Sequence, residues 1–274
     1  MSRSARKRAV STRLGEAALV CLMLLWLLSL VSNYDLTSDV NVEILNQPPT
    51  TLHILGTDKL GRDVAMRMLH ATQAFVGPGM LAAFIALIIA LPTGAIAGWH
   101  GGTVALGLRL LTTSLASIPR FVLLLLVSSI YGRDLTTLGI AAGIAYSPTL
   151  SEALYSRIVT FRDSGFVLAA KAHGLSNMKV LTYHILWSNC RTLIWRHVLA
   201  LFGFFLLIET TLSCIGGFGV QEPSPSWGNM IGIGDLQIGA NISNPFATWA
   251  PVVAIWLVLS AVAAARGTSG KANQ

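Results

Sequence analysis

Long apolar stretches separated by short polar ones make up most of this chain. A helix needs about 20 predominantly apolar residues to cross the hydrocarbon core of a bilayer. Six stretches approach that length, so the pattern predicts an all-α membrane protein with six transmembrane helices. The predicted spans cover residues 16–32, 74–98, 105–130, 136–156, 194–216 and 247–265. The fourth is the least apolar, and its many small residues favour packing between helices over contact with lipid.

The stretch FVLAAKAHGLSNMKVLTYHILW, residues 166–187 and here called the knob, interrupts this apolar pattern with two lysines, two histidines and a glycine. Its first half predicts a short helix that ends at Gly174, the residue type best suited to a left-handed cap. Ser176 or Asn177 can cap a second short helix. One face of each helix is defined by spacing: Phe166, Ala169, Ala170 and His173 on the first, and Val180, Tyr183, His184 and Trp187 on the second. Periodicity leaves open whether the knob lies on lipid headgroups or contacts another protein.

Composition supports the membrane assignment. Hydrophobic residues make up 53% of the 274 residues, charged residues only 11%, and the mean hydropathy is +0.64. Soluble domains carry about 25% charged residues, so a large soluble domain is excluded. The net charge of +7 could indicate nucleic acid binding, but its distribution indicates the inner face of a lipid bilayer instead.

Most lysines and arginines fall in residues 1–15, in the segment 157–193 and in the tail 266–274. Because basic residues concentrate in cytoplasmic loops, both termini are predicted to be cytoplasmic. Residues 16–32 are predicted to remain as an anchor, since no cleavage site follows them. Residues 33–73 then form an extracytoplasmic segment, and 74–265 a core of five further spans.

Four ordered stretches carry a family resemblance. AAKAHG followed by HIL resembles the EAA loop in permease subunits of bacterial ABC importers. HILGTDKLGRDVAMRMLHA, LPTGAIAGWHGG and ETTLSCIGGFGVQEPSPSWGNMI are similar to elements of the dipeptide, oligopeptide and nickel branch. Together they extend over residues 53–231. The chain is most similar to the second permease subunit of such systems, the type without a long additional outer domain.

The resemblance implies a type I permease bundle of an ABC importer that works by alternating access. It implies a second, homologous permease in the pore, two cytoplasmic ATPases that bind ATP and Mg, and an extracytoplasmic solute-binding protein. The loop around 157–193 would then be the coupling element that contacts the ATPase through Phe166, Ala169, Ala170, His173, Gly174, Val180 and His184. No cofactor is expected on this chain. The solute stays open between peptides, nickel chelates, opines and glycosides.

Three positions depart from the family pattern. Leu168 stands where Glu usually begins the motif, Trp187 where Pro commonly follows HIL, and Thr112 where Asp is usual. None removes the glycine or the small residues of the knob, so coupling is expected to be retained in a divergent system.

Two charged residues fall well inside predicted spans, away from their ends. Glu209 lies in the fifth span and Arg120 in the third. Charges at this depth are costly and generally face the bundle interior or a cavity. Both are therefore candidates for the translocation path. The sequence leaves open whether they pair with each other or bond locally.

The outer segment offers candidates for contact with the binding protein. GTDKLGRDVAMRMLHA predicts an amphipathic helix that begins at Asp58, with Asp58 and Arg62 spaced for an i, i+4 pair. With Asp63, Pro225 and Trp227, these residues form the predicted outer surface. The alternatives are an interfacial helix that stabilises the fold and, for 220–229, an aromatic anchor at the membrane interface.

No metal or catalytic site is expected. His53, His70, Asp35, Asp39 and Glu43 share the outer segment, but none of their spacings is that of a metal site. The chain also lacks the GxxxxGK[ST] motif of nucleotide-binding loops, so ATP hydrolysis is expected on separate subunits. Two rival functions are a secondary transporter driven by an ion gradient and a membrane scaffold without transport. ATP dependence distinguishes the first, and solute flux the second.

Overall fold

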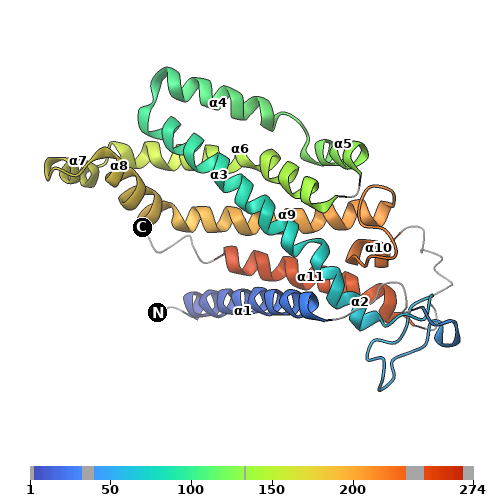
Figure 1. Ribbon diagram of the computed structural model, residues 1–274. Coiled ribbons are helices and arrows are strands. Elements are labelled where there is room, and N and C mark those ends of the chain that lie inside the picture. Colours follow the sequence, from blue (N-terminus) through green and yellow to red (C-terminus); the bar gives the residue numbers. More distant parts are fainter. Residues whose placement is uncertain (1–2, 33–39, 133, 233–243, 268–274) are drawn as a thin grey trace.

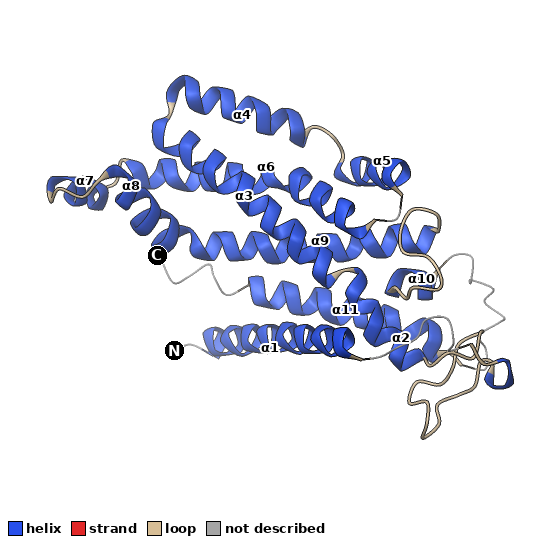
Figure 2. Ribbon diagram, viewed as in Figure 1, coloured by secondary structure: helices blue, strands red, loops and turns tan. Residues whose placement is uncertain are grey.

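The computed structural model describes residues 3–32, 40–132, 134–232 and 244–267, and in these residues all regular elements are helical. Figures 1 and 2 show an elongated bundle with the long helices running along its length. The α-helices are α1 Arg3–Val31, α2 Val64–His70, α3 Val76–His100, α4 Gly102–Ala116, α5 Arg120–Tyr131, α6 Leu135–Arg162, α7 Gly165–Ala172, α8 Asn177–Lys179, α9 Arg191–Ile215, α10 Trp227–Ile231 and α11 Phe246–Arg266. Three further elements are the 3₁₀ helices η1 Val42–Ile44 and η2 Ala71–Ala74 and the π-helix η3 Val180–Cys190.

The all-α fold is confirmed, whereas the span count is tested only in part. In the described residues, four helices are long and apolar enough to cross a membrane, or five if α4 and α5 form one broken span. α6 is not among them although it has 28 residues, and its middle carries Ser147, Thr149, Ser151 and Glu152. Six spans therefore stay a prediction. In that prediction α6 is one of the spans, and neighbouring helices cover it from lipid.

The centre of the bundle is the contact between α3 and α6, the most extensive contact between two elements of the described structure. Small residues allow the two backbones to approach closely, as in other membrane bundles. A side-chain carbon at Gly94 would lie 2.7 Å from the carbonyl oxygen of Ser151, and one at Gly143 would lie 2.5 Å from that of Ala82. Larger residues at either glycine would therefore force α3 and α6 apart.

The third predicted span is wrong as a continuous helix. α4 and α5 meet at a bend of 69°, across residues 117–119. Pro119 has no backbone N–H, and a proline also disfavours the helical conformation of the residue before it. The helix therefore ends at Ala116 and restarts at Arg120. Arg120 therefore lies at the start of a new helix, directly after the bend, instead of inside a continuous helix.

The second helix of the knob is also longer than predicted. α8, η3 and α9 follow one another without a gap and form a 39-residue helical run, Asn177–Ile215. No glycine or proline occurs between residues 175 and 202, and Trp187 occupies the position where relatives commonly have proline. Helix propagation therefore continues from the knob into the bundle. Figure 1 shows that the knob lies at the end of the bundle where α1 begins and α11 ends.

The outer helix starts later than the sequence predicts. Asp58 was expected at the N-cap, but α2 begins at Val64, with Asp63 as the cap that accepts a hydrogen bond from the Met66 N–H at 2.9 Å. The chain before it turns at Gly61, whose φ of +74° is incompatible with a right-handed helix. Asp58 instead accepts hydrogen bonds from the N–H groups of Leu60 and Arg62 within this turn.

Candidate functional site

The turn in the knob has the predicted geometry. Gly174 has a φ of +82°, the N–H of Gly174 donates to the Lys171 carbonyl at 2.9 Å, and the N–H of Leu175 donates to the Ala170 carbonyl at 3.1 Å. This pair of bonds is the Schellman motif that ends α7. Ser176 then caps the following helix by accepting a hydrogen bond from the Lys179 N–H at 3.3 Å. The knob is thus a tight helical hairpin.

The predicted contact residues of the knob divide between its inside and its outside. Phe166, Ala169, His173 and Gly174 are exposed, Ala170 and His184 are half-buried, and Val180 is buried. Val180 packs with Val167 and Ile185 against Leu154 and Ile158 of α6, so it holds the knob on the bundle. The expected common face of the second helix is not formed, because η3 has the wider period of a π-helix.

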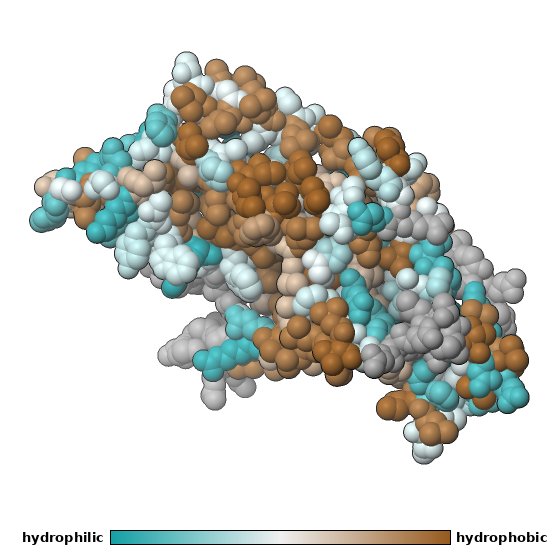
Figure 3. All heavy atoms as spheres, in the orientation of Figure 1, coloured by the Kyte–Doolittle hydropathy of each residue, from teal (hydrophilic) through white to brown (hydrophobic). Residues whose placement is uncertain are grey.

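The outside of the knob is apolar in several places. Leu168 is 64% exposed, Met178 69% and Trp187 65%. Lysines and histidines lie between these residues in the sequence, and Figure 3 shows the mixed hydrophilic and hydrophobic colouring at this end of the molecule. Large exposed apolar side chains rimmed by polar ones are typical of a surface that another protein covers.

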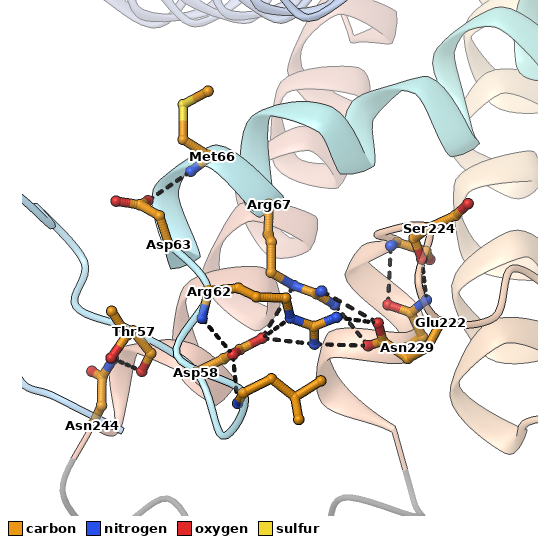
Figure 4. Close-up of polar contacts among 12 residues, drawn as sticks. Thr57, Asp58, Arg62, Asp63, Met66, Arg67, Glu222, Ser224, Asn229 and Asn244 are labelled. Carbon is orange, nitrogen blue, oxygen red and sulfur yellow. Dashed lines mark hydrogen bonds and ion pairs between the residues drawn. The ribbon is translucent and has the colours of Figure 1, made fainter. Parts of the chain in front are cut away.

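The opposite end of the bundle holds four charged side chains that we call the clamp: Asp58, Arg62, Arg67 and Glu222 (Figure 4). They come from the turn before α2, from α2 itself and from the loop between α9 and α10. Glu222 bridges the two arginines, accepting from Arg62 Nη1 at 2.6 Å and from Arg67 Nη2 at 2.8 Å. Asp58 accepts from Arg62 Nε at 2.8 Å. The side chains of Arg62 and Arg67 are only 3% and 2% exposed, against 39% for Glu222.

Mutual bonding keeps the clamp ionised despite burial. Burial alone would raise the pKa of Glu222, but the hydrogen bonds from Arg62 and Arg67 outweigh it and lower this pKa below its ordinary value. Burial likewise opposes the charge of Arg62, whereas its bonds to Glu222 and Asp58 raise its pKa overall. Two positive and two negative groups therefore balance within one buried cluster.

Most of the residues predicted to form an outer contact surface are buried in the structure. Asp58, Arg62, Pro225 and Trp227 are all buried. Asp63 is half-buried, where it caps α2 and lies 2.7 Å from Nδ1 of His53. Trp227 donates from Nε1 to the Met68 carbonyl at 3.1 Å. Trp227 thus joins the start of α10 to α2. The exposed residues of the loop 216–226 are Gly217, Glu222, Pro223 and Ser224.

Glu209 and Arg120 do not pair. Glu209 is fully buried, and its Oε1 accepts from the hydroxyls of Ser213 at 2.8 Å and Ser226 at 2.6 Å. Ser213 in turn accepts from the Val220 N–H at 2.9 Å. Glu209 therefore fastens the loop 216–226 and the start of α10 to α9. The pairing hypothesis is wrong because both groups are bonded locally.

Arg120 bonds to α6. Its Nε donates to the Ala145 carbonyl at 3.2 Å, and its Nη2 donates to the Thr149 hydroxyl. Its guanidinium also lies over the ring of Tyr146, 5.1 Å from the ring centroid, which is a cation–π contact. Within the described residues no carboxylate pairs with it.

Sequence reasoning missed the most connected members of the clamp. Arg67 and Glu222 were not selected, although Arg67 bonds a residue 155 positions away. The available signal was the position of Arg67 in the helix, since it stands four residues after Asp63 in an otherwise apolar run. Asn244 was also missed, and its side chain donates to the carbonyls of Leu55 and Thr57.

No three histidine, cysteine, aspartate or glutamate residues gather in a way that could hold a metal ion within the parts of the chain that are described. His53 and His70 contact Asp63 and Ser32 respectively. Asp35 and Asp39 lie outside the described residues.

Comparison with known proteins decides the family. Residues 90–267 match the model of the binding-protein-dependent transport system inner membrane component family. The chain belongs to this family. The match covers the core of the bundle from α3 to α11 and confirms the permease resemblance seen in the sequence.

Several relatives of this permease align with most of its length. It is 29% identical over 234 residues to a putative peptide transport system permease of Brucella suis biovar 1 (strain 1330), covering 85% of this chain and 78% of that protein. It is 30% identical over 218 residues to a probable D,D-dipeptide transport system permease of Escherichia coli (strain K12), with coverages of 78% and 72%. It is 28% identical over 217 residues to the nickel transport system permease of the same strain, with 78% of each chain covered.

A solved structure shows the same fold. A chain of the MetNI methionine ABC transporter, in an inward-facing conformation, aligns with a TM-score of 0.54 at 13% identity. The alignment covers 72% of this permease and 93% of that chain. The bundle architecture of an ABC transporter permease is therefore shared.

Proposed function

We propose that this permease is one of two related pore subunits in an ATP-driven importer of peptides or a related small solute such as a nickel chelate or an opine. Two cytoplasmic ATPases bind ATP and Mg, an extracytoplasmic binding protein delivers the solute, and the pore works by alternating access. Relatives named for peptides, dipeptides and nickel support this range of solutes. Both termini lie in the cytoplasm of a bacterial cell, on the same side as the knob.

The observation that carries the proposal is the knob. It is a hairpin fixed by a Schellman turn, seated on α6 by buried Val167 and Val180, and apolar on its outer surface. A segment that only joined two spans would not need exposed leucine, methionine and tryptophan side chains. Docking into a groove of an ATPase covers this surface and gives it a function.

The helical run Asn177–Ile215 supplies the mechanical connection. One of its ends lies in the knob, and the other is fastened to the loop 216–226 by Glu209 and Ser213. A displacement of the knob by the ATPases therefore moves a continuous helix whose far end holds the loop 216–226, which carries Glu222 of the clamp. Rigid movement of such a packed element is a common basis for switching between two states.

The test is purification of the tagged permease from its native membranes in mild detergent, with mass spectrometry of the proteins that accompany it. Leu168→Glu with Met178→Glu places charges on the outer surface of the knob, where both side chains are exposed and contribute little to folding. Leu52→Glu is the matched control, because Leu52 is also highly exposed but lies in the extracytoplasmic segment.

We expect an ATPase and a second permease to accompany the wild type and the control, and the ATPase to be lost from the double variant. Retention of the ATPase by the double variant would show that the knob is not its docking site. If the stable wild-type chain is purified alone and its transport does not depend on ATP, the permease is driven by an ion gradient instead.

A further inference from the structure

The face of the bundle formed by α4, α5 and the adjoining side of α6 carries polar groups that hydrocarbon would not accommodate. Arg109 of α4 pairs with Glu152 of α6 at 3.0 Å, and the two side chains remain 47% and 45% exposed. Thr113 and Ser114 of α4, and Ser117 directly after it, are also exposed. Charged groups within a membrane bundle generally face its interior or a water-filled cavity. This face therefore either lines an aqueous path or is covered by the partner that encloses that path.

Two arginines lie on this face, and only one of them is paired with a carboxylate. Arg109 is neutralised by two hydrogen bonds to Glu152, at 3.1 and 3.0 Å. Arg120 bonds only neutral oxygens, those of Ala145 and Thr149. Among the described residues, Arg120 is thus a cation on this face without an anionic partner.

The position of Arg120 suits the recognition of a solute. It begins α5, directly after the 69° bend, and Thr149, which it contacts, lies near the middle of α6. Broken helices near the middle of the bilayer are a recurring place for anionic solute groups in transporters. The positive end of α5 adds to the charge of the side chain.

The remaining donors fit a carboxylate. A guanidinium has five N–H groups in a planar fork. Nε and Nη2 each use one for the bonds to Ala145 and Thr149, which leaves the two N–H groups of Nη1 and the second of Nη2. Adjacent Nη1 and Nη2 donors match the two oxygens of a carboxylate.

We propose that the Arg120 guanidinium binds a carboxylate group of the transported solute as the solute passes the bend between α4 and α5. This inference rests on the proposed function and narrows it to solutes that carry a free carboxylate. Arg120 selects for that group, whereas the Arg109–Glu152 pair presents no net charge to the solute.

The experiment uses Thr149→Cys, which places a thiol next to Arg120, in the full chain with Cys21, Cys190 and Cys214 replaced by serine. Rates of labelling are measured with a negatively charged and a positively charged methanethiosulfonate reagent, and their ratio is divided by the ratio for free cysteine. One charge at about 6 Å in water changes each rate about threefold, so we expect the normalised ratio to favour the anionic reagent about tenfold.

Arg120→Gln should abolish this preference, and Arg120→Lys should retain most of it, which separates loss of charge from loss of fold. The double variant Arg109→Gln with Glu152→Gln is the matched control, because it removes a nearby arginine without changing the net charge, and should leave the ratio unchanged. Chloride should slow labelling by the anionic reagent only through screening of the Arg120 charge, and acetate at the same ionic strength should slow it further.

Equal labelling by the two reagents before Arg120 is replaced would overturn the inference. So would labelling by a membrane-permeant maleimide alone, since Thr149 would then face no aqueous path. Equal slowing by acetate and chloride would also overturn it, because the site would lack selectivity for carboxylates. None of these results depends on copurification of an ATPase, so a failure of the proposed function remains distinguishable.

Discussion

The two ends of the helical run Asn177–Ile215 differ in which side chains are buried: charged ones are buried at one end, whereas apolar ones are exposed at the other. At the clamp end, Asp58, Arg62, Arg67 and the Glu209 carboxylate are withdrawn from solvent, only Glu222 remains partly exposed, and all five are bonded to one another or to serines. At the knob end, leucine, methionine and tryptophan side chains are exposed. Buried polar groups are costly unless their bonds are satisfied, and the clamp end satisfies nearly all of them within the chain.

The difference indicates which surfaces are complete. The clamp end is closed by its own contacts, so it positions the loop 216–226 before any partner arrives. The knob end leaves apolar surface open, and such surface is favourable only when a partner covers it. Substitutions at the clamp should therefore change the stability of the isolated permease, whereas substitutions on the knob should change its association with other subunits.

The largest expected effect comes from Arg67→Leu. It leaves Glu222 and Asp58 with Arg62 as their only basic partner in the cluster. Breaking a fully buried ion pair costs about 3–5 kcal/mol, and the expected loss is at the lower end, about 3 kcal/mol, because Glu222 is partly exposed and keeps its bond to Arg62. Thermal unfolding of the purified permease in detergent measures the loss. Arg109→Leu, which breaks a half-exposed pair, should lower the melting temperature much less. Equal decreases in melting temperature for the two variants would show that the clamp stabilises the fold no more than the half-exposed pair does.

A smaller effect is expected at Glu209. Glu209→Ala removes the acceptor of two buried serine hydroxyls, and each unsatisfied group costs about 1–3 kcal/mol. Glu209→Gln keeps an oxygen that can accept both bonds and should be milder. Hydrogen exchange of residues 216–231 measures the effect, because this loop should lose protection first in the alanine variant. Unchanged exchange in that variant would mean that Glu209 does not hold the loop.

Gly174→Ala should cost about 1 kcal/mol, because alanine is strained at a φ of +82° while no atom lies within 4 Å of the added carbon. Gly165→Ala is the matched control in the same hairpin, at a site equally open but without positive φ, and should not destabilise. The contrast is sharper in copurification, where only Gly174→Ala should weaken the recovery of an ATPase. Equal recovery from both variants would argue against a required turn geometry.

The smallest effect is the dependence of clamp stability on pH. The pKa of Glu222 is lower in the folded permease than its ordinary value of about 4.3. The unfolded chain therefore binds this proton first on acidification, and the stabilisation is complete above that value and lost as the pH falls through the folded pKa. Carboxylates titrate between roughly pH 6 and pH 3.5. Over this range the unfolding temperature of Glu222→Gln should fall less steeply than that of the wild type. If the two curves of unfolding temperature against pH run parallel, Glu222 is not the group whose titration lowers the stability.

Much of the fold could be predicted because its causes are local. Apolar runs of membrane length, the glycine at 174 and the serine at 176 act over a few residues, and the structure places helices, the left-handed turn and the helix cap at these positions. Local signals also misled at two places. Apolar composition hid the break at Pro119, and the helical spacing after Asp58 hid the turn that Gly61 imposes.

The candidate sites were less accessible to the same reasoning. The sequence predicts that Asp58 and Arg62 lie on the outer surface because they belong to the polar segment between the first two spans, but burial depends on what the rest of the chain places over them. Glu222 provides that cover from a loop 160 positions away from Arg62. The sequence contains no local signal for such a partner.

The sequence by itself determined the helical elements, the family motifs and the knob, since each follows from periodicity or from a residue's own conformational preference. Only the tertiary structure decided that Arg67 and Glu222 meet, that Glu209 binds two serines and that Arg120 has no carboxylate among the described residues. The physical reason is that electrostatic and hydrogen-bond partners are selected by distance in space, which the order of residues along the chain does not specify.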